Sequence, residues 1–97
     1  MNFSEALANV KCGLKVAREG WNGFARKDWN EKSRMFIYLV PGSTFKVNRA
    51  PLLGIYPEDT EINYQPHIDM RTAQGTCVPW LASQTDLLAE DWYNVVD

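Results

Sequence analysis

The sequence predicts an α+β domain, in which an N-terminal helix packs on a mostly antiparallel sheet of about five strands and a short helical turn precedes the last strand. Three observations predict this class. The first residues repeat apolar side chains at helical spacing, several later segments alternate or run apolar as strands do, and turn residues separate these segments. We expect a single domain over residues 1–97, because a chain of this length supports one modest core.

The expected helix starts at the N-terminus. Asn2 can cap it, with Glu5 as the third helical residue of a capping box, and Gly13 can end it. Lys15–Arg18 alternates in the manner of a strand, and Glu19–Gly23, which contains two glycines, is expected to be a turn.

The clearest strand is Met35–Val40, an unbroken apolar and aromatic run expected at the centre of the sheet with both faces covered. The polar segment 24–33 before it is expected to be a long loop between two strands, and such loops are often functional. Thr44–Val47 alternates and is expected to return along the sheet. Asn48–Gln65 is expected to be a long irregular loop, either disordered or used at an interface.

The last third predicts a hairpin formed by His67–Thr72 and Thr76–Trp80, with Gly75 in the left-handed turn position. Pro79 cannot donate a ladder hydrogen bond, so the second arm of the hairpin should end at a sheet edge or at a strand end. A final strand is expected over Trp92–Val96.

Residues 78–92 are the most distinctive stretch of the chain. Ser83 and Asp86 have the spacing of a capping box, which predicts a helix of one or two turns over Gln84–Ala89. The apolar members of this stretch are expected to lie in the core: Trp80, Leu81, Leu87, Leu88 and Trp92.

Charge and aromatic content restrict the partners. Nine of the ten basic residues but only four of the twelve acidic residues lie in residues 1–51. Two halves of opposite sign favour pairing within the fold or self-association, and they argue against general nucleic-acid binding. Four Trp, four Tyr and four Phe exceed what one small core hides, so some rings should lie in a pocket or a subunit interface.

Several functional classes lack their sequence signatures. The first residues do not resemble a signal peptide and no apolar run is long enough to span a bilayer, so we expect a soluble intracellular protein. Cys12 and Cys77, with one histidine in the chain, predict buried thiols rather than a disulfide or a zinc site. The glycines form neither a P-loop nor a dinucleotide fingerprint, and we expect no metal and no cofactor.

What remains is a set of side chains suited to a nucleotide, although each is also compatible with a structural role. Four rings can stack on a base: Trp21, Phe24, Tyr38 and Trp80. Three arginines can hold phosphate: Arg18, Arg49 and Arg71. The polar side chains that can bond hydroxyls are Asn22, Ser43, Gln84, Thr85 and Asp86. A separate pair, His67 and Asp69, has the spacing of side chains on one strand face, either as a surface pair or for acid–base chemistry.

Three motifs carry a family resemblance. They are N-F-S-E-A-L followed by K-V-A-R-E-G-W-N-G, then Y-L-V-P-G-S, then V-P-W-L-A-S-Q-T-D-L-L-A-E-D-W. Together they resemble the phage Thoeris anti-defence proteins of the second type, over residues 2 to about 96. Residues 25–33 and 48–65 have no counterpart in the motifs and are expected to vary.

The resemblance implies a sponge, that is, a protein that binds and retains a signal molecule, and not an enzyme. Family members bind the cyclic ADP-ribose signal of the bacterial Thoeris system, glycocyclic ADP-ribose, in the host cytoplasm and sequester it without cleavage. Members are similar in forming homotetramers with pockets between protomers, and some also hold cyclic oligonucleotides of the CBASS system. The resemblance assigns ligand contact to Trp21, Asn22, Ser43, Gln84, Thr85 and Asp86, with Trp21 stacked on adenine; chemistry adds Phe24, Tyr38 and Arg71.

Two alternatives belong to other functional classes. One is a hydrolase of cyclic nucleotides that uses His67 and Asp69. The other is an interaction module whose exposed rings bind a host protein.

Overall fold

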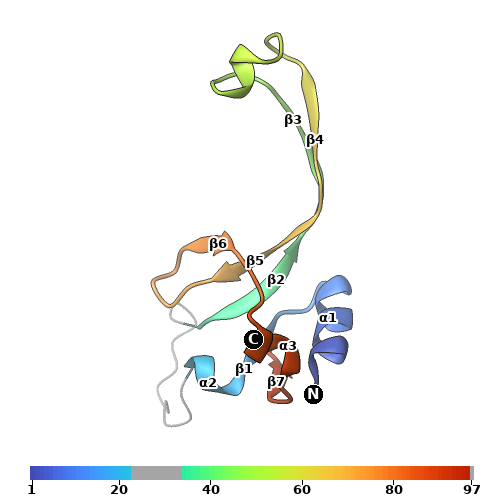
Figure 1. The fold of residues 1–97 in the computed structure, drawn as a ribbon, viewed down its shortest axis with the longest axis vertical. Helices are drawn as coiled ribbons and strands as arrows, with labels where there is room; N and C mark the ends of the chain where they lie inside the picture. The colour runs from blue at the N-terminus through green and yellow to red at the C-terminus, as the bar shows by residue number, and fades with distance from the viewer. Residues whose placement is uncertain (23–33, 97) are drawn as a thin grey trace.

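The computed structural model describes residues 1–22 and 34–96 and confirms the expected α+β class. A body that holds the α-helices and a five-stranded sheet carries a long arm (Figure 1). The elements in chain order are α1 (Phe3–Lys11), β1 (Val16–Arg18), α2 (Glu19–Asn22), β2 (Phe36–Val40), β3 (Ser43–Lys46), η2 (Leu52–Gly54), β4 (Glu61–Tyr64), β5 (His67–Arg71), β6 (Cys77–Pro79), α3 (Gln84–Leu88) and β7 (Trp92–Asn94).

The body sheet has the strand order β6-β5-β2-β1-β7, and its neighbouring strands are antiparallel. The apolar run at residues 36–40 therefore takes the central position that its sequence predicts, but the expectation that both of its faces are covered is wrong: Ile37 is buried, whereas Phe36, Tyr38 and Val40 on the other face are only half-buried. β6, which ends in Pro79, is an edge strand, as expected for a residue without a backbone N–H.

The core lies between one face of this sheet and α1. Ala6 and Val10 of the helix are fully buried, and they pack with Val16, Ile37 and Trp92 of the strands. Because strand side chains alternate between faces, Tyr38 lies on the opposite face from Ile37. The helices thus define an inner face of the sheet, and Tyr38 belongs to its outer face.

Local signals set the ends of the helices. The Asn2 side chain accepts a hydrogen bond from the Glu5 N–H at 2.9 Å, which completes the predicted capping box of α1. Gly13, with φ of +92°, follows the end of the helix, and Gly75, with φ of +85°, makes the turn between β5 and β6.

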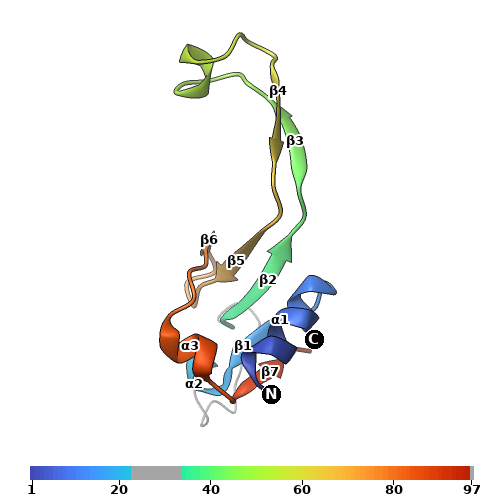
Figure 2. The ribbon, with the colours of Figure 1, turned by 45° about the vertical axis from the view of Figure 1, so that its right-hand side comes forward.

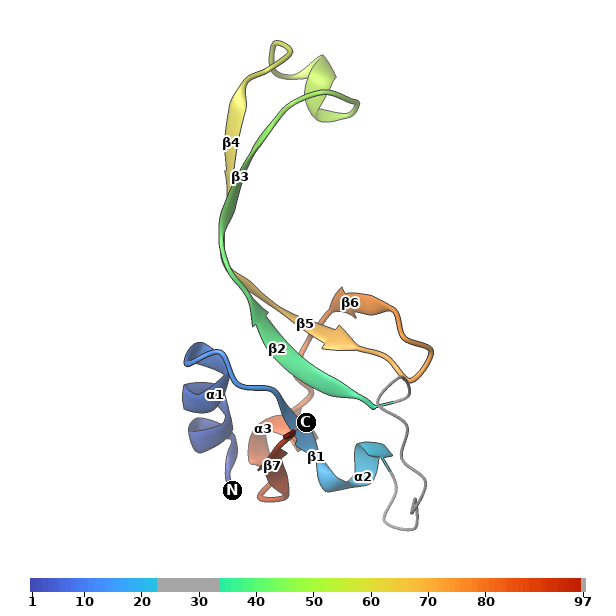
Figure 3. The same ribbon diagram turned by 180° about the vertical axis from the view of Figure 1, so that it is seen from behind.

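The arm, residues 43–64, is the feature that departs most from a compact domain. β3 and β4 pair only with each other, and β2 continues into β3 while β4 continues into β5 (Figures 2 and 3). The molecule measures 52 × 28 × 23 Å, and its radius of gyration of 16.7 Å exceeds the roughly 13 Å of a compact chain of this size. The arm carries its tip, residues 47–60, away from the body and from both termini (Figure 1).

Two sequence-based expectations fail at the arm. The segment at 44–47 was expected to return along the body sheet, but β3 runs outward and pairs with β4 instead. The expected irregular loop over 48–65 is wrong in its second part, because residues 61–64 form β4. Gly42 permits the tight junction with the body: a Cβ there would lie 3.1 Å from the backbone oxygen of Tyr64.

Other corrections concern burial and the segment after β1. Residues 19–22 form the short helix α2 and not a turn, and both Cys12 and Cys77 are exposed free thiols rather than buried ones. Trp92 is buried and Trp80 packs against the core as expected, but three leucines predicted in the core are exposed at the surface: Leu81 (90%), Leu87 (47%) and Leu88 (81%). Among the described residues, no helix is long and apolar enough to cross a bilayer.

We expect Trp92→Ala to lower the free energy of unfolding by about 3–5 kcal/mol, because it removes a large side chain that is only 2% exposed. Val96→Ala, which truncates a 75% exposed side chain near the same end of the chain, should change it by less than about 0.5 kcal/mol. Urea denaturation measures both. Equal losses in the two variants would contradict the assignment of Trp92 to the core.

Candidate functional site

The N-terminal turn of α3 is built by the reciprocal cap that the sequence predicts. The Ser83 hydroxyl accepts a hydrogen bond from the Asp86 N–H at 3.1 Å, and Asp86 Oδ2 accepts one from the Ser83 N–H at 3.0 Å. The helix ends at Leu88, one residue earlier than expected.

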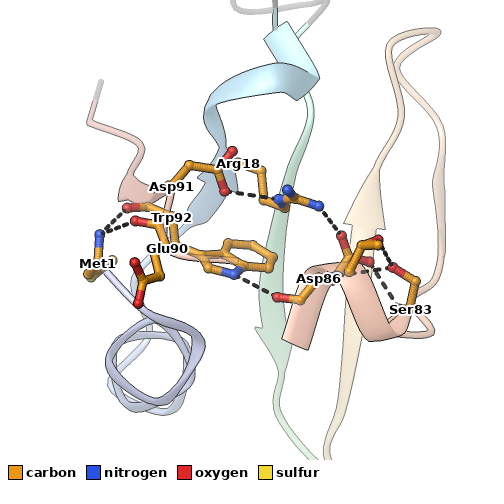
Figure 4. A network of polar contacts seen from close by, with 8 residues as sticks. Met1, Arg18, Ser83, Asp86, Glu90, Asp91 and Trp92 are labelled. Atoms are coloured by element: carbon orange, nitrogen blue, oxygen red, sulfur yellow. Dashed lines mark hydrogen bonds and ion pairs between the residues drawn. The ribbon is translucent and has the colours of Figure 1, made fainter. Parts of the chain in front are cut away.

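Arg18 of β1 connects this turn to the segment before β7 (Figure 4). Its Nη1 donates to Asp86 Oδ1 at 2.9 Å, and its Nε donates to Asp91 Oδ1 at 3.0 Å. The Asp86 side chain is only 13% exposed, so its pair with Arg18 is partly shielded from solvent. A single arginine thereby fixes α3 relative to β1 and β7.

The indole of Trp92 completes this network from the core side. Its Nε1 donates to the Asp86 carbonyl oxygen at 3.0 Å, and the N-terminal ammonium group of Met1 donates to the Trp92 carbonyl oxygen at 2.8 Å (Figure 4). Three rings surround the Trp92 ring at centroid distances of 5.3–6.1 Å: Trp21, Phe3 and Trp80.

The charges of this network determine its response to pH. Burial of the Asp86 carboxyl favours its protonated form, but hydrogen bonds from Ser83 and Arg18 outweigh burial and hold its pKa below the ordinary value of 3.8. Hydrogen bonds to Asp91 and Asp86 raise the pKa of the Arg18 guanidinium. Both groups are therefore charged at neutral pH.

The candidate residues around α3 differ in what they can offer a ligand. Gln84 and Thr85 are exposed, and the Thr85 hydroxyl lies 2.8 Å from the Ser83 hydroxyl. Both carboxylate oxygens of Asp86 are already used within the fold. Trp21 is half-buried with its edge against Trp92, so the structure brings it to the same indole that bonds Asp86.

Tyr38 and Arg71 lie on the outer face of the sheet, away from α3. In the register of β2 and β5, Tyr38 lies opposite Asp69 and Arg71 lies opposite Phe36. The Phe36 ring is 5.7 Å from the Tyr38 ring, and the Arg71 guanidinium lies 5.9 Å from the Phe36 centroid. This face therefore combines rings with a cation, as a nucleotide site requires, but in a different place from Gln84 and Thr85.

The same face carries the pair considered for acid–base chemistry. His67 Nε2 lies 3.7 Å from Asp69 Oδ1, as their spacing on one strand predicts, and His67 Nδ1 lies 3.2 Å from the Gln65 carbonyl oxygen. A hydrogen bond with the Cys77 thiol, burial and nearby negative charge raise the pKa of Tyr38 to about 12. The Tyr38 hydroxyl is thus protonated across the physiological range.

The remaining candidates are dispersed. Ser43 begins β3 and is exposed where the arm leaves the body, opposite Tyr64. Asn22 ends α2, and Phe24 lies outside the described residues. In the described ranges, 1–22 and 34–96, no three His, Cys, Asp or Glu side chains come together in a group suited to a metal ion.

Sequence reasoning assigned Arg18 to phosphate and did not single out Asp91. In the structure Arg18 is occupied by two carboxylates, one of them 73 residues away, and no local pattern indicates such a contact. Sequence reasoning also missed that the leucines near Gln84 and Thr85 lie at the surface. The spacing of apolar residues does not indicate which side of a short helix packs against the core.

Comparison with known proteins gives two findings. The sequence profile of the Thoeris anti-defense 2-like domain matches residues 1–95. The protein named Thoeris anti-defense 2 of Bacillus phage SP01 is 34% identical over 92 residues, which cover 95% of this chain and 91% of that protein.

We expect Asp86→Ala to lower the free energy of unfolding at pH 7 by about 1–3 kcal/mol, because it removes a cap and an ion pair. Folding lowers the Asp86 pKa, so the contribution of the carboxylate is complete above about pH 4 and is lost as the pH falls through the folded-state pKa. The difference in unfolding free energy between parent and variant, measured by urea denaturation, should therefore become smaller below about pH 4. Glu58→Ala, which removes an exposed carboxyl on the arm, should have the same unfolding free energy as the parent at every pH. If the loss of unfolding free energy in Asp86→Ala did not change with pH, the ion-pair account would be contradicted.

Proposed function

The chain belongs to the Thoeris anti-defense 2-like family and has its phage anti-defence role, and we propose that it acts as a sponge for the Thoeris signal. In this proposal the protein binds glycocyclic ADP-ribose in the cytoplasm of the infected host and retains it intact, so the signal does not reach its effector. Cyclic oligonucleotides are a second class of ligand to be tested in the same way.

The observation that carries this proposal is the exposed polar turn of α3 beside a cluster of rings. Gln84 and Thr85 present an amide and a hydroxyl to solvent, and these groups suit the hydroxyls of a ribose. The turn that holds them is fixed by the Ser83 cap and by Arg18, so binding does not have to order it. Preorganisation of this kind favours the tight binding that a sponge requires.

A second copy of the chain is proposed to complete the pocket. Tyr38 and Arg71 lie on the outer face of the sheet, whereas Gln84 and Thr85 lie on α3 at the inner face. One chain does not bring both sets to one ligand, but the outer face of one copy can face α3 of another. The exposed Leu81 and Leu88 beside the polar turn supply apolar surface for such a contact.

A hydrolase is the second candidate, and the contact between His67 and Asp69 favours it. The two functions differ in the fate of the ligand, because a hydrolase releases a cleaved product and a sponge releases what it bound.

When the protein is incubated with glycocyclic ADP-ribose and then denatured by heat, we expect intact signal in the supernatant by chromatography and mass spectrometry. His67→Ala should release the same intact compound in the same amount, since the proposal gives His67 no chemical role. A linear ADP-ribose product from the parent, lost in His67→Ala, would instead establish the hydrolase. A panel of cyclic di- and trinucleotides, treated identically, tests the second ligand class.

We expect the parent to be a homo-oligomer, a tetramer by family resemblance, and the double variant Leu81→Asp and Leu88→Asp to have a lower mass by light scattering. The reason is that a carboxylate would be desolvated at each apolar contact. Val96→Asp, which places the same charge on another exposed apolar residue, should keep the parental mass. A monomeric parent at assay concentration would contradict the shared pocket.

A further inference from the structure

The tip of the arm contains a hollow that is separate from the residues considered so far. It is lined by the consecutive residues 45–52 and has a volume of about 470 Å³. Pockets for small molecules have volumes of about 300–1,000 Å³, so the hollow is large enough for one. The tip lies at the far end of the arm from the body, so a ligand held there would not touch α3 of the same chain (Figure 1).

One part of the lining is suited to an anion. Arg49 contributes a positive charge, and the lining includes no carboxylate. In the described part of the chain, no ion pair or hydrogen bond engages the side chains of Lys46, Asn48 or Arg49. The backbone N–H groups of Asn48 and Arg49 also lack a backbone partner there. The unpaired N–H groups and the Arg49 guanidinium match the oxygens of a phosphate group.

The other part of the lining is apolar. Phe45 is 37% exposed, and Pro51 and Leu52 continue the wall beside it. An exposed ring next to a proline offers a surface on which a planar ring can stack.

The tip is held in shape without help from the body. Val47 is 1% exposed, its N–H donates to the Thr60 carbonyl oxygen at 3.0 Å, and its carbonyl oxygen accepts from the Asp59 N–H at 2.9 Å. A hollow anchored in this way exists before a ligand arrives, which lowers the entropic cost of binding.

We propose that the arm-tip hollow is a second ligand site, which binds a phosphate ester carrying a planar ring, of the size of a mononucleotide. The phosphate lies against Arg49 and the free N–H groups, and the ring lies against Phe45. This site is independent of the pocket proposed at α3, so either can exist without the other.

The test is a titration of the uniformly ¹⁵N-labelled full chain with adenosine 5′-monophosphate, followed through the amide resonances of Asn48, Arg49, Ala50 and Leu52. We expect saturable shifts confined to the tip. Adenosine, which lacks the phosphate, and inorganic phosphate, which lacks the ring, should each bind at least tenfold more weakly, because each satisfies only one part of the lining.

Matched variants separate the site from a general effect of charge. Arg49→Gln should weaken the binding at least tenfold, whereas Lys11→Gln, which removes one positive charge from the exposed end of α1, should leave it unchanged. Unshifted Val47 and Thr60 resonances in Arg49→Gln would verify that its tip is folded. The proposal is overturned if the tip resonances do not shift on addition of the nucleotide, which would also be the result if another chain filled the hollow. It is also overturned if inorganic phosphate alone binds as tightly as the nucleotide. Gln84→Ala should not alter the tip shifts, so failure at one site is distinguishable from failure at the other.

Discussion

The burial of Trp92 is the constraint on which the rest of the body depends. Its ring is surrounded by aromatic side chains from α1, from α2 and from the residue after β6, and its indole N–H satisfies a carbonyl oxygen in α3. Its backbone carbonyl oxygen also accepts a hydrogen bond from the N-terminal ammonium group of Met1. Segments from both ends of the chain are thereby fixed around one side chain, and Arg18 adds the polar half of the same junction. The exposed turn at Gln84 is rigid because its neighbours are held in this way.

The features that the sequence predicts correctly are local. Asn2 with Glu5, and Ser83 with Asp86, form their caps within four residues, and the glycine turns need only their own backbone freedom. The partner of a strand is not local: β3 looks like any alternating strand, and its partner β4 lies in a segment rich in Pro, Gly and acids. The same limit applied to the site, since Arg18 suits a phosphate until two distant carboxylates are seen to occupy it.

The arm and the body divide the molecule into surfaces with different chemistry. The body places its exposed leucines beside a polar turn, which suits a contact between copies around a ligand rather than a closed pocket in one chain. The arm has almost no buried apolar residue except Val47, so its stability depends on the backbone pairing of β3 with β4 and on the hydrogen bonds of its tip. The α3 turn and the arm-tip hollow therefore lie in different parts of the molecule.

We propose that this family member holds an intact cyclic ADP-ribose signal tightly enough to deprive an effector of it. Titration calorimetry of glycocyclic ADP-ribose into the purified protein tests it most directly. The account predicts saturable binding with a Kd near the nanomolar range, about 12 kcal/mol of binding free energy, that is weakened in a Gln84→Ala, Thr85→Val double variant whose melting temperature matches the parent. An absence of saturable heat with a folded parent protein, or unchanged affinity in the double variant, would contradict it.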